Sequence, residues 1–117
     1  MEEFEIIFYD KPDGTEPAKE FILSLDDKMR AKVLSLLELL SVNGSKLREP
    51  YSKHIVDGIF ELRAKVGSNI SRVFYFFVVG KKIVITNGFI KKTQKTPKKE
   101  IELAKKYRNE FINRGDY

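Results

Sequence analysis

The alternation of apolar and polar positions is clearest between Ile59 and Lys92. Three runs rich in β-branched and aromatic residues, 59–66, 70–79 and 82–92, are separated by short segments that contain glycine. Runs of this composition predict strands, and connections of this length predict hairpins. We therefore expect three consecutive antiparallel strands, paired as a meander.

The first hairpin has one register that keeps its charged side chains out of the core. If Val66 pairs with Asn69, then Arg63 lies opposite Arg72. A slip of one residue would turn Arg72 toward the apolar face, where an unpaired guanidinium is costly to bury. We therefore predict that the two arginines share one face. The other face should hold the apolar side chains of the hairpin: Phe60, Leu62, Ala64, Val73, Tyr75 and Phe77.

The third strand has two possible orientations. Either Ile83, Ile85 and Phe89 or Val84, Thr86 and Ile90 could face the core, because both sets alternate along the run. One of the two lysines that close the strand, Lys91 or Lys92, therefore shares the face of the arginines. The pattern alone does not choose between them.

The flanking segments predict one strand and three helices. The apolar run 4–9 ends in Pro and Asp-Gly turn chemistry, and Thr15 suits the N-cap of a helix that reaches Leu25. Asp26 suits the cap of a second helix that ends at Asn43–Gly44, and Thr96 caps a last helix from Pro97 to about Ile112. The connection 45–58 is polar and should be irregular. The expected fold is therefore one α+β domain over 1–117, with a small, mainly antiparallel sheet, an N-terminal helical hairpin and a C-terminal helix.

Composition adds two expectations about location and partners. The 117 residues include no cysteine, which fits a reducing cytoplasm, and the acidic N-terminus is unlike a signal peptide. No apolar run is long enough for a bilayer, so we expect a cytoplasmic protein without a membrane contact. The net charge of +5 and the pI near 9.4 favour a polyanionic partner.

The candidate chemistry belongs to the cations of the meander. Arg63 and Arg72, with Lys91 or Lys92, could bind a phosphate through bidentate and point-charge contacts. In cleavage of RNA by 2'-hydroxyl attack, such groups stabilise the charge on the phosphorane, and a lysine with a shifted pKa or His54 could move protons. No metal or other cofactor is required. Structural roles remain as alternatives: Arg63 could pair near Glu61, and His54 could be a solvated loop residue.

Other chemistries lack their residues. The sequence has one histidine and no cysteine for a transition-metal cluster, no phosphate-cradling glycine loop, and no serine or cysteine nucleophile with a plausible base. A metal site built from carboxylates alone remains open, although the acids are scattered. We therefore expect a site that contains no metal.

A set of short motifs in the second half of the chain resembles a known toxin family. The motifs are Gly58-Ile-Phe-Glu-Leu-Arg63, Arg72-Val-Phe-Tyr75, Gly88-Phe-Ile-Lys-Lys-Thr93, and Thr96-Pro97 followed by Glu100, Ile101 and Ala104. In this order they are similar to the phage-derived HigB-like branch of the RelE/ParE toxin superfamily. The resemblance implies a RelE-like fold and the toxin of a type II toxin–antitoxin pair, which cleaves mRNA in the ribosomal A site. It also implies a HigA-like helix-turn-helix antitoxin as partner, and contact with DNA only through that antitoxin.

The resemblance also implies roles for individual residues. Arg72 matches the arginine before the aromatic residue of the second strand, Arg63 matches a basic position on the preceding strand, and Lys91 and Lys92 match the basic pair after the third. The segment 93–97 holds no tyrosine and the C-terminal part no histidine, so His54, Lys91 and Lys92 are the candidates for proton transfer. The remaining cations are candidates for RNA binding: Lys46, Arg48, Lys53, Lys65 and Lys95. ParE relatives share the fold and poison gyrase, so a non-catalytic gyrase poison or a basic RNA-binding module is the alternative.

Overall fold

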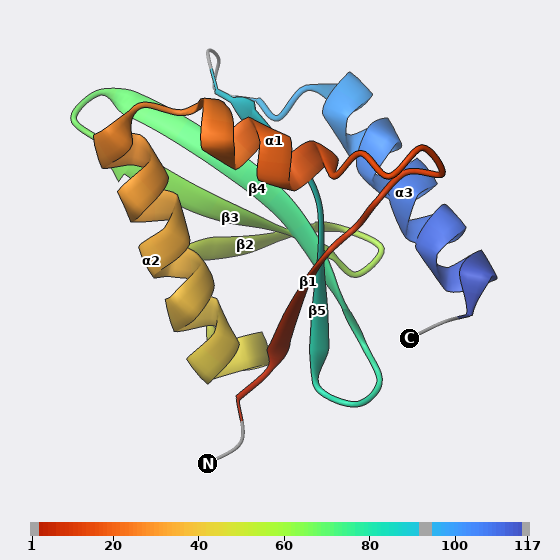
Figure 1. Ribbon diagram of the computed structural model, residues 1–117. Coiled ribbons are helices and arrows are strands. Elements are labelled where there is room, and N and C mark those ends of the chain that lie inside the picture. The colour runs from red at the N-terminus through yellow and green to blue at the C-terminus, as the bar shows by residue number, and fades with distance from the viewer. Residues whose placement is uncertain (1–2, 92–94, 116–117) are drawn as a thin grey trace.

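A five-stranded mixed sheet with three helices forms the molecule (Figure 1). The computed structural model describes residues 3–91 and 95–115. The strand order is β1-β5-β4-β3-β2, and only the β1–β5 pair is parallel. The α+β class and the mainly antiparallel sheet are thus confirmed. In chain order the elements are β1 (Glu5–Phe8), α1 (Pro17–Ser24), α2 (Asp27–Asn43), η1 (Gly44–Lys46), β2 (Ser52–Val56), β3 (Ile59–Val66), β4 (Asn69–Val78), β5 (Lys82–Ile90) and α3 (Lys98–Arg114).

The hairpin of β3 and β4 has the register that the charge pattern predicts. Val66 pairs with Asn69, and Arg63 lies opposite Arg72. The apolar side chains of the other face belong to the main core, with the helices of the N-terminal hairpin packed on them. The prediction that the two arginines share a face is therefore confirmed.

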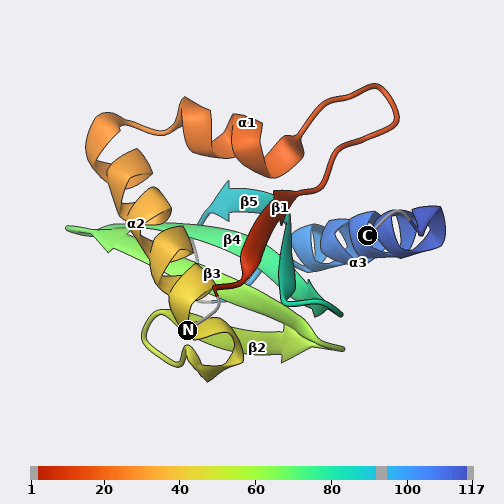
Figure 2. The ribbon, with the colours of Figure 1, turned by 60° about the horizontal axis from the view of Figure 1, so that its bottom comes forward.

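Helices cover both faces of the central strands. Figure 2 shows α1 and α2 together on one face, and α3 packs against the other through Tyr107 and Phe111. Tyr9, Phe76 and Val84 are buried beneath α3. Because both faces are covered, β4 and β5 carry nearly continuous apolar runs. The expectation that only one face is core was therefore wrong for these strands.

A bulge in β5 explains why the alternation along this strand was ambiguous. The pairing with β4 shifts by one residue between Val73 and Tyr75, so that β5 contains one extra residue there. On one side of the bulge, Ile83 and Ile85 face the main core. Beyond it, Phe89 pairs with Arg72 and packs in the cluster beside α3.

One predicted helix cap is confirmed and two differ. Asp26 caps α2 as expected, and its side chain accepts from the Met29 amide at 2.9 Å. The N-cap of α1 is Glu16 rather than Thr15, and the N-cap of α3 is Pro97 rather than Thr96. Thr96 instead donates its hydroxyl proton to Glu61 on β3. A contact with a distant strand therefore replaces a local cap at the start of α3.

The connection predicted to be irregular contains a strand. β2 (Ser52–Val56) pairs antiparallel with β3 at the edge of the sheet, after the short 3-10 turn η1. The polar character of the segment is explained by its edge position, where one side of the strand meets solvent. Successive residues of β2 point to opposite faces, which determines where Lys53 and His54 lie. Within the described residues, no helix is both long and apolar enough to cross a membrane.

Candidate functional site

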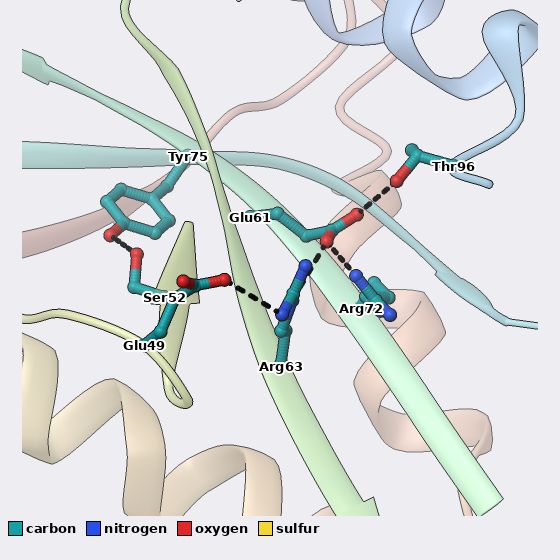
Figure 3. Close-up of polar contacts among 7 residues, drawn as sticks. All are labelled: Glu49, Ser52, Glu61, Arg63, Arg72, Tyr75 and Thr96. Carbon is teal, nitrogen blue, oxygen red and sulfur yellow. Dashed lines mark hydrogen bonds and ion pairs between the residues drawn. The ribbon is translucent and has the colours of Figure 1, made fainter. Parts of the chain in front are cut away.

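A buried carboxylate, Glu61, is the centre of the polar group on the α3 face of the sheet (Figure 3). Its Oε1 accepts from the Arg72 Nη1 and, at 3.3 Å, from the Arg63 Nε. Its Oε2 accepts from the Thr96 hydroxyl at 2.9 Å. One side chain of β3 thus holds an arginine on its own strand, an arginine on β4 and the segment that leads into α3. We call Arg63, Arg72 and Lys91, together with Glu61, the cationic cluster.

Arg72 is the buried arginine of the cluster. It lies in the middle of β4, between Arg63 on β3 and Phe89 on β5, and is 4% exposed. Its Nε is buried and has no hydrogen-bond partner among the described residues. Buried donors in native proteins nearly always have a partner, so an unused one in a polar group is unusual. Arg72 therefore has a donor beyond its ion pair with Glu61.

Arg63 is the more accessible arginine. Its side chain is 25% exposed, and its Nη1 lies 3.4 Å from the Oε1 of Glu49 in the loop before β2. The Glu49 side chain is 64% exposed, so this ion pair is solvated and weak. An incoming anion would therefore displace Glu49 at little cost, while Glu61 stays in place.

Lys91 is the lysine that shares the face of the arginines. Its backbone N–H donates to the Ile70 carbonyl at 2.9 Å, which continues the β4–β5 ladder. Strand alternation from Phe89 then places Lys91 on the side of Arg72. Partial burial lowers the pKa of Lys91, as do Arg72, Arg63 and Lys53, and Glu61 opposes them. Lys92, the other candidate, lies outside the described residues.

The remaining predicted residues divide between the two faces. Lys53 lies opposite Glu61 in the β2–β3 ladder, on the face of the cluster, and Lys65 follows Arg63 on the same face and is exposed. Lys95 is exposed just before α3, and Lys46 is exposed in η1. Arg48 donates to the Ser45 carbonyl at 2.6 Å.

His54 is not part of the cluster. It lies opposite Phe60 in the ladder, and its ring packs edge-on against Phe60 with the centroids 5.1 Å apart. Its Nε2 accepts from the Gly58 amide at 3.1 Å. Because it follows Lys53 directly on β2, its side chain lies on the other face of the sheet. The structure thus gives no support to a catalytic role beside the arginines.

The residue that sequence reasoning missed is Glu61. The alternation of β3 places Glu61 on the face of Arg63, but alternation alone does not show that this carboxylate is buried between two arginines. Its burial follows from α3 and the segment around Thr96, which cover this end of the face. The apolar stripe of the last helix could have indicated this burial, because such a stripe must pack on a second face of the sheet.

The charges of the cluster suit an anion. Two guanidinium groups and a lysine surround a single buried carboxylate, and Lys53 adds a further charge nearby. Arg63 is the partly exposed arginine of the cluster, and guanidinium groups can make bidentate contacts to a phosphate. In the part of the chain that the structure describes, no three histidine, aspartate or glutamate side chains lie close enough to hold a metal ion.

Comparison with known proteins gives one family match. The model of the family described as phage derived protein Gp49-like (DUF891) matches residues 20–109. This range includes α2, all strands after β1 and every member of the cationic cluster. No curated protein sequence matches the chain.

Proposed function

The chain belongs to the Gp49-like family of phage-derived, toxin-like proteins, and on this basis we propose that it is the toxin of a type II toxin–antitoxin pair and cleaves mRNA. The observation that carries the proposal is the cationic cluster, in which two arginines are held on one buried carboxylate. The resemblance of its motifs to RelE and HigB toxins supports a RelE-like fold and cleavage on the ribosome. It also supports a HigA-like helix-turn-helix antitoxin as the partner.

The two arginines have different tasks in this proposal. Arg63, at the accessible edge, binds the phosphate that is to be cleaved and exchanges its contact with Glu49 for one with the ligand. Arg72 stabilises the negative charge that builds on the phosphorane, where a fixed donor in a buried place is most effective. Glu61 orients both guanidinium groups. It is poorly suited to act as a base, because both of its oxygens already accept hydrogen bonds.

Lys91 is the residue best suited to move protons. In the proposed reaction the 2'-oxygen bonds to phosphorus, its proton leaves, and the 5'-oxygen departs with a proton, which gives a cyclic phosphate and a free 5'-hydroxyl. A lysine with a lowered pKa exchanges protons closer to neutral pH than an ordinary lysine does. Lys91 also lies on the face of the arginines, and the proposed reaction uses these side chains without a metal.

Mapping of RNA ends after induction tests the proposal. The wild-type protein should produce new 5' ends within translated messages, and Arg63→Ala and Lys91→Ala should each reduce cleavage by about a hundredfold. Arg63 is a better probe than Arg72, because Arg72 is buried and its loss threatens the fold. Lys32→Ala, on the exposed side of α2, is the matched control and should cleave normally.

The same experiment separates the alternative function. Growth arrest with intact messages would contradict the proposal. Accumulation of cleaved gyrase–DNA complexes under those conditions would support a gyrase poison instead. Binding of RNA without new ends would support a non-catalytic RNA-binding module.

A further inference from the structure

A separate hollow lies on the face of β2 opposite the cationic cluster. Its volume is about 400 Å³, within the range of small-molecule pockets. It lies between η1, the loop that follows η1 and the edge strand β2. We call it the β2-edge hollow; its lining residues are Ser45, Leu47, Arg48, Ser52, His54 and Phe60.

One wall of the β2-edge hollow is aromatic and fixed in place. The rings of His54 and Phe60 meet edge to face with their planes at 72°. Phe60 also stacks on Tyr75, with centroids 5.4 Å apart, and the Tyr75 hydroxyl is hydrogen-bonded to Ser52. Figure 3 shows this hydroxyl pair apart from the Glu61 group. A planar, unsaturated ring is the kind of ligand that such a wall favours.

The polar groups of the hollow favour an anion. The Arg48 Nη1 is held by the Ser45 carbonyl, and its other guanidinium nitrogens have no partner among the described residues. Because the His54 Nε2 accepts from the Gly58 amide, the neutral ring carries its proton on Nδ1, where it can donate. None of the lining residues is acidic. A nucleotide combines the two features that the hollow favours, a planar base and a negatively charged phosphate.

The hollow and the cationic cluster meet at the edge of the sheet. Arg48 lines the hollow, and the next residue, Glu49, contacts Arg63 of the cluster. On β2, Lys53 lies on the cluster face and the next residue, His54, lies in the hollow. A single RNA strand that crosses this edge would therefore reach both places with neighbouring nucleotides.

We propose that the β2-edge hollow binds a nucleotide of the RNA substrate next to the one whose phosphate is cleaved. The base packs against Phe60 and His54, and a phosphate oxygen binds Arg48. This inference rests on the proposed function, because it takes RNA as the substrate. It gives His54 and Arg48 a binding role at a distance from the reacting atoms.

Binding of an uncleavable RNA tests the inference. A 2'-O-methylated pentanucleotide, followed by fluorescence anisotropy, should bind Arg48→Ala and His54→Ala about tenfold more weakly than the wild type. Lys32→Ala is the control and should bind normally. All three side chains are exposed, so thermal melts should show that each variant is folded, with a slightly lower midpoint for His54→Ala because it loses the contacts with Phe60 and Gly58. Unchanged affinity in both hollow variants would overturn the inference.

A mononucleotide gives a second, independent measurement. Addition of adenosine monophosphate to the wild-type protein should shift the backbone amide resonances of Ser52, His54 and Gly58. Shifts confined to Arg63 and Lys91 would overturn the inference. Failure of this inference can be distinguished from failure of the proposed function. Normal cleavage by the two hollow variants would contradict the nucleotide subsite and leave the nuclease activity standing. Loss of RNA affinity in these variants, with no cleavage by the wild type, would contradict the nuclease activity and support the subsite.

Discussion

At the scale of single residues, Glu61 determines whether two arginines, one of them buried, can lie side by side. Two guanidinium groups repel each other, and taking a charge out of water is costly unless it is paired. In this protein the carboxylate of Glu61 lies between them and is itself fully buried. The stability of the sheet and the geometry of the proposed phosphate site therefore depend on the same side chain.

Substitution of Glu61 should be strongly destabilising. Glu61→Gln keeps the shape but leaves Arg72 buried without a counter-charge, so the free energy of unfolding should fall by about 3 kcal/mol in urea titrations. Glu49→Gln removes the exposed partner of Arg63 and should change stability by less than about 0.5 kcal/mol. The double variant Glu61→Met, Arg72→Met should recover most of the loss, since no buried charge is then left unpaired and Arg63 keeps Glu49. A Glu61→Gln protein as stable as the wild type would contradict this account.

The residues of the cluster show which parts of the site can be predicted from the sequence alone. Charge alternation was enough to place Arg63 opposite Arg72, because a strand has only two faces. The expectation that this register keeps Arg72 out of a buried environment was wrong, since Arg72 is buried there and paired with Glu61. The same argument could not show that Glu61 is buried, since burial depends on where α3 packs. Nor could it separate Lys91 from Lys92, because a bulge in β5 changes the alternation before the strand ends.

At the scale of elements, α1 docks on β5 through a close contact with Gly88. This residue pairs with Val73, and a Cβ atom added to it would lie 2.4 Å from the Phe21 ring and 3.0 Å from the Arg72 carbonyl oxygen. The missing side chain thus lets the helix approach the strand beside the cluster. Any larger residue would push α1 away from the sheet.

Gly88→Ala should therefore destabilise the protein through overpacking. We expect a loss of about 1–3 kcal/mol in the free energy of unfolding, measured by urea titration. Phe21→Ala combined with Gly88→Ala should cost less than the sum of the single changes, because the methyl group added at position 88 then fills the space left by the Phe21 ring. Additive costs would show that the Phe21 ring is not the obstacle.

β2 shows why one element was missed. Its sequence, Ser-Lys-His-Ile-Val, has little apolar alternation and follows Pro50 closely. An edge strand of this kind is stabilised by its ladder with β3 rather than by its own propensity. The helices were easier to predict, since the apolar stripe of α2 recurs at helical spacing over its whole length.

At the scale of the whole molecule, the two ends of the described chain are joined. The Tyr9 hydroxyl donates to Glu110 of α3 at 2.8 Å, and the Tyr9 ring stacks on Tyr107. Arg114 pairs with Asp10 at 2.9 Å and lies over the Tyr9 ring. These contacts connect residues about a hundred positions apart and hold α3 on the sheet face that carries the cluster.

Tyr9 should make stability fall at alkaline pH. Burial and the neighbouring Glu110 raise the pKa of Tyr9 from 10.0 to about 12. Below pH 10 the phenol is protonated in both the folded and the unfolded chain; between pH 10 and 12 only the unfolded chain releases the proton, so folding is progressively disfavoured. Urea titrations over this range should show a steeper decline for the wild type than for Tyr9→Phe. Parallel declines would contradict the assignment.

The parallel pairing of β1 with β5 has a consequence for the order of synthesis. The first strand of the chain finds its partner only after Lys82–Ile90 has been made, and at that point the cluster still lacks Lys91, and Glu61 lacks its bond from Thr96. Domains fold as units during translation, so a half-made chain contains neither the complete five-stranded sheet nor the proposed catalytic centre. Completion of the sheet and of the cluster is therefore postponed until the residues that follow β5 have been made.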